Sequence, residues 1–582
     1  MKTPSATELD LRSGGGFLLC DPTEAPIFVP EGFSEMQRDF YDACTAFMNG
    51  EIIPRNAEIE RGDAELNREL LRKTCELGLC SVEVPEEHGG LGLGKITAFL
   101  VAEGLSGHGS YATTFGAHSS IGTLPIVYFG NEETKRELLP KLCSGEVLSC
   151  YALTETGSGS DALAAKCKAV LNAEGTHYLL SGSKQFISNG ACSDIAVVFA
   201  KVDGSQFTGF VVDLKAPGVE IGPDEHKMGI RGSNTNALHF DQTPVPVERV
   251  LGEIGKGHRI AFNILNLGRM KLATAALGGC KRLLALCLGY AGERHQFGRP
   301  IRDFGAMRQK FSRMGVATFA TESACYRTAG DMDRRLLELA GVPEVEKFAA
   351  IEEFAAEAAI CKVMGSEAAG MAADEAVQIH GGYGYTEEYP VEQAYRDTRI
   401  NRIYEGTNEI NRMLIPGTLL KRALKGRLDL MSVAPAITAE LADEAYEPPH
   451  FDGEFGHERS LLHLMKRRTL YTMNNAAMKL QTELQERQEV LMALADMIIA
   501  LYAADSCLAR AMQLDASRDT HPGAWFPTKI YVREAWDVID TNARRVLFHI
   551  AGSKGKVVHR NNLAVWDLLP EADVLGLELD YA

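Results

Sequence analysis

Most of the chain shows the hydrophobic pattern of amphipathic helices. Apolar residues recur three and four positions apart, which predicts helices, at Phe33–Asn49, Ala64–Leu79, Thr97–Leu105 and Glu132–Leu142. Longer helices are expected at 257–293, 304–338 and 344–379, and another is expected to begin near Thr407. Two further helical regions are expected at 455–515 and 527–550.

One region, 147–250, has a different pattern. Its β-branched and aromatic runs are broken by turn residues, and Asp203-Gly204 marks a hairpin, so a mostly antiparallel β domain is expected. Prolines at 435, 448 and 449 indicate a linker. Helices, then a sheet, then helices predict a mainly α fold with a central β domain. The expected units are an irregular segment (1–32), a helical domain (33–146), the β domain (147–250), a second helical domain (251–430), a linker (431–452) and a helical extension (453–582).

Composition and charge narrow the classes of partner. The 582 residues carry a net charge of −18, which argues against general binding to nucleic acid or anionic lipid. The 13 cysteines lack CxxC spacing, so neither a zinc cluster nor a redox pair is expected and no metal is assigned. The start of the chain has no apolar targeting pattern, and a cytoplasmic, bacterial protein is expected.

Two segments raise the question of a membrane. The apolar run Val490–Met512 contains Asp496, Asp505 and Arg510, so a buried or amphipathic helix is expected instead of a span. The basic run 466–468 is expected to be a solvated helix face, with contact to anionic lipid as the alternative.

A glycine-rich motif, Gly157–Ala162, fits G-x-G-x-x-A. A dinucleotide fingerprint needs a helix next, because the helix N-terminus holds the pyrophosphate. The following residues instead resemble a hairpin, so a Rossmann domain is disfavoured. A plain turn, or a loop that holds a flavin or a phosphate, are the two remaining interpretations. No G-x-S-x-G elbow or HExxH motif is present.

Glu405 stands in RIYEGTNEINR, where an isolated EGT would be an ordinary acid beside a helix cap. The longer run 381–412 nevertheless resembles the C-terminal signature of the acyl-CoA dehydrogenase flavoenzymes. Three further segments resemble that family in the same order: VPEEHGGLGL at 84–93, YALTETGSGSD at 151–161 and ERHQFGRPI at 293–301. The resemblance covers about residues 33–425. It implies the family's fold: an N-terminal helical domain, a middle β domain and a C-terminal helical bundle.

The resemblance also implies FAD as cofactor, bound between the β domain and the helical domains. One set of residues would contact the FAD of the same chain: Tyr151, Leu153, Thr154, Gly159, Ser160, Phe186, Ile187, Ser188, Thr407 and Glu409. A second set would reach the FAD of a partner subunit: Arg294, His295, Gln296, Phe297, Phe304, Gln378, Ile379, Gly381 and Gly382. A homodimer is therefore expected.

The resemblance assigns the chemistry to Glu405, as the base that removes the α-proton of an acyl-CoA thioester. The backbone N–H of Glu405 would polarise the thioester carbonyl, and the β-hydrogen would leave as hydride to the flavin. The positions implied to contact substrate are Ser160, Asn266, Arg269, Gly406, Gly116 and Ala117. Some relatives place the base on the helix aligned with 267–269, where this chain has no acid.

FGAHSSIG at 115–122 and NILNLGR at 263–269 resemble the very-long-chain branch, which also has a C-terminal helical extension. The small residues Gly116 and Ala117 imply room for a long acyl tail, with Phe115 as the side chain able to shorten the pocket. Electron-transfer flavoprotein is the implied electron acceptor. Two alternatives stay open: an acyl-CoA oxidase that uses oxygen, and a non-catalytic acyl-CoA-binding or assembly protein.

Overall fold

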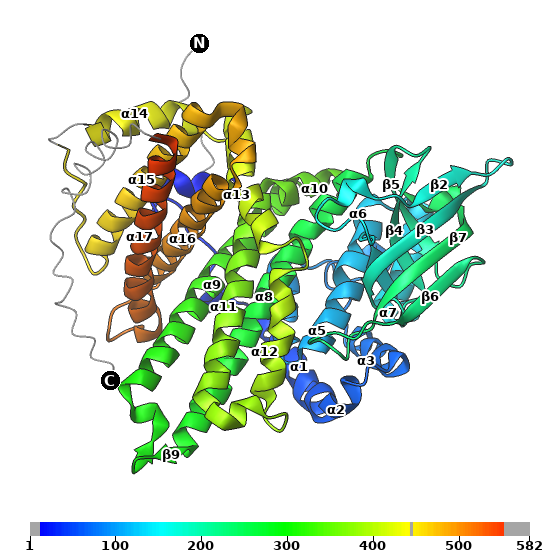
Figure 1. Ribbon diagram of the computed structural model, residues 1–582, viewed down its shortest axis with the longest axis horizontal. Helices are drawn as coiled ribbons and strands as arrows, with labels where there is room; N and C mark the ends of the chain where they lie inside the picture. The colour runs from blue at the N-terminus through cyan, green and yellow to red at the C-terminus, as the bar shows by residue number, and fades with distance from the viewer. Residues whose placement is uncertain (1–11, 443–445, 552–582) are drawn as a thin grey trace.

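The computed structural model describes residues 12–442 and 446–551. It has a sheet domain at one end, long helices through the middle and a further helical bundle at the other end (Figure 1). The expected mainly α fold with a central β domain is confirmed.

The N-terminal helices follow the predicted segments closely. Ser34 begins the first of them with a capping box, in which its hydroxyl accepts from the Gln37 N–H and the Gln37 side chain accepts from the Ser34 N–H. The helices before the sheet are α1 (Glu35–Phe47), α2 (Asn56–Ile59), α3 (Ala64–Glu76), α4 (Lys95–Gly104), α5 (Gly109–Gly116), α6 (Leu124–Phe129) and α7 (Glu132–Ser144). A short π-helical segment, η7 (Ala117–Gly122), continues α5.

The sheet is mostly antiparallel, as expected, in the order β6-β7-β3-β2-β4-β5-β8, and β1 pairs in parallel with β4. Its strands are β1 (Ser149–Ala152), β2 (Lys168–Leu171), β3 (His177–Ser188), β4 (Ile195–Val202), β5 (Gln206–Asp213), β6 (Val219–Asp224), β7 (Thr235–Pro246) and β8 (Val250–Leu251). Asp203 and Gly204 both have positive φ in the β4–β5 hairpin, which confirms that turn. The motif at 157–162 is a turn after β1, followed by one 3₁₀ turn and the β2–β3 hairpin, so no Rossmann helix follows it.

The long helices after the sheet form the centre of the molecule. They are α8 (Gly257–Glu293), α9 (Gly305–Glu338), α10 (Glu344–Glu353), α11 (Ala355–His380), α12 (Pro390–Thr398) and α13 (Asn408–Leu424). A short ribbon, β9 (His295–Gln296) and β10 (Arg299–Pro300), joins α8 to α9. The single helix expected over 344–379 is instead two helices, because the chain leaves helical geometry at Phe354, whose ring is buried.

The first half of the predicted linker is wrong. Residues 430–442 form α14 (Leu430–Ala442), and this helix buries Leu430, Ala434, Ile437 and Leu441. Pro435 lies inside this helix and has no N–H to donate to the carbonyl four residues before it, so one backbone hydrogen bond of the helix is missing there. Residues 446–452 have no regular structure, and 443–445 lie outside the described residues.

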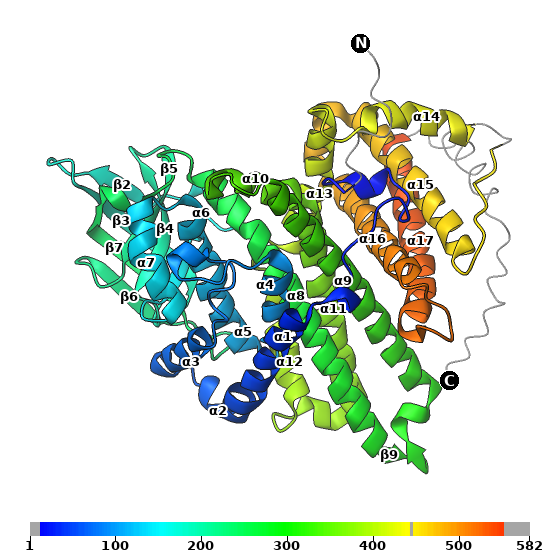
Figure 2. The same ribbon diagram turned by 180° about the vertical axis from the view of Figure 1, so that it is seen from behind.

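The extension is a bundle of α15 (Gly456–Leu480), α16 (Gln488–Gln513) and α17 (Pro522–Ala551). The extension is expected from the sequence to reach residue 582, and residues 552–582 lie outside the described part. Helix α16 packs against α17, α15, α13 and α9, and so joins the extension to the central helices. The segment before α1 runs from the extension to the helical domain (Figure 2), and its Phe17 ring packs 4.7 Å from that of Tyr502.

The basic run in α15 is not the expected solvated face. Lys466 and Arg468 are buried, and Lys466 Nζ lies 2.7 Å from Asp505 Oδ2 on α16. Arg327 on α9 reaches the other oxygen of the same carboxylate at 2.7 Å. Only Arg467 remains half-exposed, paired with Glu440. Asp505 therefore ties α15 and α16 to α9, and Lys466 and Arg468 are used inside the fold instead of at a solvated face.

Two helices, α8 and α16, are long and apolar enough to cross a membrane by length and composition. In α16, 78% of the most apolar window is buried inside the fold, which confirms the expected buried helix; in α8 the share is 50%. Both pack along several neighbouring helices. Burial against those neighbours accounts for their apolar character.

Candidate active site

A cavity of about 420 Å³ lies among α5, η7, α8 and α12. Gly116 and Ala117 form one wall, and nothing lies within 4 Å of where a side chain on Gly116 would begin. One stripe of α8, from Gly268 to Leu286, forms another wall. That stripe spans about 27 Å of helix axis, so the cavity is a channel and not a shallow cup.

Glu405 lies at one end of this channel, on the turn before α13. Its backbone is left-handed, with φ 57°, and Gly406 follows with φ 79°. For a residue other than glycine this conformation costs about 1–2 kcal/mol. Its carboxylate oxygen Oε2 is buried and has no hydrogen-bond partner among the described residues. The carboxylate rests on Gly268, since a Cβ there would stand 2.5 Å from Oε2.

The electrostatics of Glu405 are those of a buried acid near cations. Burial raises its pKa to about 7, although Arg269 and Lys362 oppose the shift. Burial also raises the pKa of the Tyr151 phenol well above its usual range, and the charge of Glu405 adds to that effect. The Tyr151 hydroxyl is a second buried group without a partner in the described part of the chain. A carboxylate with a pKa near neutrality and a free oxygen is suited to accept a proton.

Side chains from two helices hold the turn in place. Arg269 on α8 donates from Nε to the Glu405 carbonyl at 3.3 Å, while its Nη1 donates to Asn266 at 2.6 Å. Asn411 on α13 donates to the carbonyls of Glu405 and Gly406 at 3.3 and 2.8 Å. No acceptor for the Glu405 N–H lies within the described chain, so this donor is free for a ligand.

The residues expected around a flavin lie on two adjoining pieces of the β domain and at the start of α13. Phe186 lies at a bulge in β3, where the pairing with β7 shifts, has φ 58° and has a side chain that is 63% exposed. Ser188, two residues on, lines the channel. An exposed aromatic face beside a hydroxyl at the channel mouth fits a flat heteroaromatic ring. Thr407 uses its hydroxyl to cap α13, accepting from Ile410 N–H, and Glu409 is exposed.

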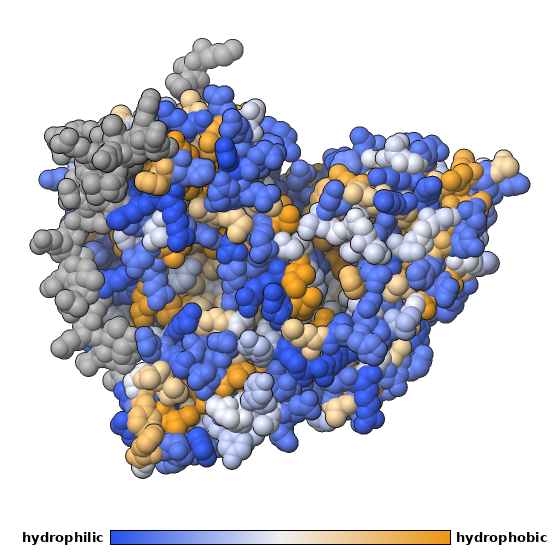
Figure 3. Space-filling model, viewed as in Figure 1, coloured by the Kyte–Doolittle hydropathy of each residue, from blue (hydrophilic) through white to orange (hydrophobic). Residues whose placement is uncertain are grey.

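The expected partner-reaching residues form a separate group at the far end of the long helices. The Arg294 guanidinium lies 5.6 Å from the ring of Tyr383, the residue that follows Gly381 and Gly382 in the chain. Both views place β9 far from β3, so this group does not meet Phe186 within one chain (Figures 1 and 2). Apolar side chains gather on the β9 end (Figure 3), where Phe297 is 95% exposed.

The expected substrate contacts divide into three groups. Gly116 and Ala117 line the channel, and Gly406 follows Glu405 on the turn. Asn266 and Arg269 lie behind the turn as supports and do not line the channel. Ser160 is exposed and also outside its lining.

Sequence reasoning missed three residues of the site. Gly268 stands out in the sequence only because this part of the chain has no acid. In the structure, the absence of a side chain at Gly268 leaves the space that the Glu405 carboxylate occupies. Tyr404 lines the channel, and burial raises the pKa of its phenol. Lys362 lies on α11, more than forty residues before the turn that it contacts. A lysine inside the apolar, alanine-rich pattern of α11 is the available signal.

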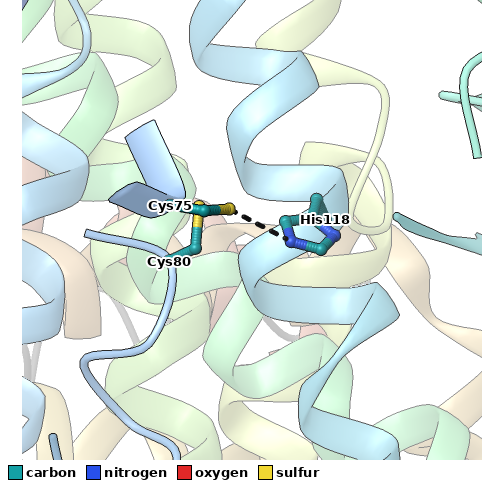
Figure 4. A group of neighbouring side chains, drawn as sticks. All are labelled: Cys75, Cys80 and His118. Carbon is teal, nitrogen blue, oxygen red and sulfur yellow. Dashed lines mark hydrogen bonds between the residues drawn. The ribbon is translucent and has the colours of Figure 1, made fainter. Parts of the chain in front are cut away.

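The fold also brings together two cysteines and a histidine, which their spacing does not indicate: Cys75, Cys80 and His118 (Figure 4). Cys75 Sγ lies 3.8 Å from His118 Nε2. The imidazole is already used, because Nδ1 accepts from the Ser149 N–H at 3.2 Å and Nε2 then donates to the Leu142 carbonyl at 3.1 Å. A metal needs a free nitrogen lone pair, so this cluster is assigned a packing role.

Comparison with known proteins identifies the family. The models for the N-terminal, middle and C-terminal domains of acyl-CoA dehydrogenases match residues 34–146, 150–243 and 255–420, and a further C-terminal domain model matches 464–559. A probable acyl-CoA dehydrogenase of Bacillus subtilis is 44% identical over 92% of this chain and 91% of its own length.

Two further relatives support the match. The crystal structure of an acyl-CoA dehydrogenase complexed with FAD from Bacillus anthracis aligns with a TM-score of 0.93 and 41% identity, over 96% of this chain and 95% of that one. The mitochondrial very long-chain specific acyl-CoA dehydrogenase of Rattus norvegicus is 37% identical over 69% of this chain and 59% of its own length. The chain belongs to the acyl-CoA dehydrogenase family.

Proposed function

We propose that this chain is an FAD-dependent dehydrogenase that introduces the α,β double bond into long-chain acyl-CoA thioesters, with Glu405 as the base. The observation that carries the proposal is the Glu405 carboxylate, which is buried at the end of an apolar channel with one oxygen free and a pKa near 7. The FAD relative and the family match support the cofactor.

The chain's own groups would act on the α-carbon. The acidity of a thioester α-proton is low, so the base and the carbonyl contact have to work together. A thioester oxygen that accepts from the free Glu405 N–H would gain negative charge as the proton leaves. The left-handed turn makes this possible, because it presents that N–H and the carboxylate from one residue.

FAD, when bound, supplies the acceptor for the β-hydrogen as hydride. Phe186 and Ser188 would hold its ring system against the channel mouth, and the end of β1 with the turn after it, from Tyr151 to Ser160, would border it. Thr407 and Glu409 would contact the cofactor from the start of α13. With the acyl tail bound, the apolar residues that line the channel would exclude water from the reacting atoms, which would strengthen each electrostatic contact there.

The length of the channel supports a preference for long acyl tails. Its α8 wall follows five helical turns past Gly268, and its small residues leave the Gly116 side open. Each methylene buried along it adds about 0.8 kcal/mol. Phe115 lines the channel too, with its side chain buried, and is the residue that could shorten the space for the tail. The very long-chain relative agrees with this preference.

The assembly and the electron acceptor are proposed as well. Phe297, exposed and strained at φ 53°, and Arg294 at the β9 end would reach the FAD of a second copy, which gives a homodimer. The extension covers α9 and α13 within the chain, so these helices are not free for a further dimer contact. Electron-transfer flavoprotein is proposed to accept the electrons.

One experiment tests the function. Anaerobic addition of palmitoyl-CoA to the purified yellow protein should bleach the flavin, and Glu405→Gln should slow that bleaching by about 10³-fold while the protein stays yellow. Glu392→Gln is the control, since Glu392 is a half-buried acid on α12 that pairs with Arg396. Bleaching at the normal rate in Glu405→Gln would contradict the assignment. Peroxide formation in air without a need for electron-transfer flavoprotein would indicate an oxidase. If palmitoyl-CoA did not bleach the flavin at all, the protein would be a non-catalytic binder.

A further inference from the structure

A buried lysine supports the Glu405 turn from outside the segment that contains it. Lys362 lies on α11 with its side chain fully buried. Its Nζ donates to the Gly406 carbonyl at 2.7 Å and to Asn408 Oδ1 at 2.8 Å. It is therefore the support that ties the turn to α11, whereas Arg269 ties it to α8 and Asn411 is local.

The turn needs such support because two successive residues are left-handed. Glu405 and Gly406 both have positive φ, so their carbonyls leave the helix direction and cannot pair within a regular element. Each carbonyl is instead taken by side-chain donors. Loss of one donor would let the turn relax toward an ordinary conformation and move the carboxylate.

The same lysine is linked to the C-terminal extension by a continuous series of polar contacts. Asn408 Nδ2 donates to Glu367 Oε1 at 3.0 Å. Glu367 receives Arg412 in a two-point contact of 2.7 and 3.0 Å. Arg412 Nε then donates to Asp496 Oδ1 of α16 at 2.7 Å. The extension thus touches the support of the proposed base within one chain.

We propose that Lys362 is a positioning residue for Glu405, and that the extension contributes to the same task through Asp496 and Arg412. The proposal rests on Glu405 being the base. It gives the extension a role in the reaction besides covering the central helices.

The charges around Lys362 set the expected direction of the pH effect. Burial lowers the pKa of Lys362 to about 7, against the attraction of Glu405. The charged groups that face it are Glu405 on the turn, Arg269 on α8, Glu367 on α11 and Glu409 on α13. Lys362 in turn favours the ionised form of Glu405. Removing the lysine should therefore raise the pKa of Glu405, whereas a purely structural loss would leave that pKa where it was.

The first test compares Lys362→Met with Lys362→Arg in the FAD-loaded enzyme. The methionine variant should lose about tenfold in kcat, with little change in KM, and the acidic limb of its pH profile should move upward. The arginine variant keeps a charged donor and should recover part of the loss. Lys362→Gln, a neutral donor, replaces the methionine variant if that protein does not fold, and should show the same upward shift. An unmoved limb together with an unchanged kcat would overturn the proposal.

A readout without turnover separates this proposal from the proposed function. Infrared titration follows the protonated carboxyl of Glu405 as the band that is absent from Glu405→Gln. That band should persist to higher pH in Lys362→Met than in the native protein, and no difference would overturn the proposal. If Glu405→Gln instead kept full turnover, the base assignment would fail while the titration still reported whether Lys362 controls the carboxylate.

The role of the extension is tested with a matched pair of variants. Asp496→Asn removes one of the two acids on Arg412, and Glu31→Gln removes one of the two acids on Arg510, at a similar exposure of 35% and 38%. Asp496→Asn should lower kcat by about threefold with unchanged unfolding temperature, and Glu31→Gln should leave kcat unchanged. Equal kcat values in the two variants would remove the extension from the proposal.

Discussion

Gly268→Ala is the sharpest test of how the Glu405 carboxylate is placed. A methyl group at this position would stand 2.5 Å from Glu405 Oε2 and 3.0 Å from Oε1. Ordinary contact begins near 3.4 Å, so the carboxylate would have to move by about 0.9 Å. A displacement of about 1 Å from the reacting geometry costs on the order of 10²-fold in rate.

Stability should respond in the opposite direction. Alanine is preferred to glycine inside a helix by about 1 kcal/mol, and the group that must yield is the end of a flexible side chain. Gly268→Ala should therefore fold as well as the native protein while kcat falls by about 10²-fold. A loss of rate without loss of stability distinguishes this effect from general damage to the core.

Gly279→Ala is the matched control. It lies on the same channel-facing stripe of α8, and nothing lies within 4 Å of where its side chain would begin. Stopped-flow bleaching of the flavin by palmitoyl-CoA, with thermal unfolding of each variant, gives both quantities. Full activity of Gly268→Ala would refute the placement of the carboxylate, and an equal loss in Gly279→Ala would show that any added methyl on α8 is harmful.

Four further outcomes are expected. Gly116→Leu should lower kcat/KM for palmitoyl-CoA by at least about tenfold and spare butyryl-CoA, and an unchanged chain-length profile would contradict the channel assignment. Because burial raises the pKa of Glu405 to about 7 and a base must be ionised, kcat/KM should fall as pH drops through neutrality; a flat profile there would count against it. Arg294→Ala should purify with less FAD than the native protein, measured by absorbance, whereas full occupancy would indicate only the ring contact with Tyr383. Asp505→Asn should destabilise the protein by about 3–5 kcal/mol in denaturant titration, because the buried cations Arg327 and Lys466 lose the negative charge that they share. A smaller loss of stability would mean that these two cations find other partners.

The sequence by itself determined most of the order of helices and strands, apart from the break at Phe354 and the helix α14, and it indicated the class of chemistry. Long apolar periodicities fixed α8 and α9 to within a residue, because a helix that packs on several sides must repeat its apolar positions throughout. The Asp203-Gly204 turn was readable because few residues accept positive φ. The EGT run pointed to Glu405 through its resemblance to a family.

The tertiary structure alone decided which residues serve that acid. Gly268, Lys362 and Asp496 are far from Glu405 in sequence. Lys362 stands out in the apolar pattern of α11, but no local pattern shows which residue any of the three contacts. The same is true of Lys466 on α15. Its charge predicted a solvated position, whereas the structure buries it against Asp505 of α16. Local sequence predicts the secondary structure of a segment and which side of that element is buried. Contacts between segments depend on packing, which brings distant side chains within hydrogen-bond distance without marking them in the sequence.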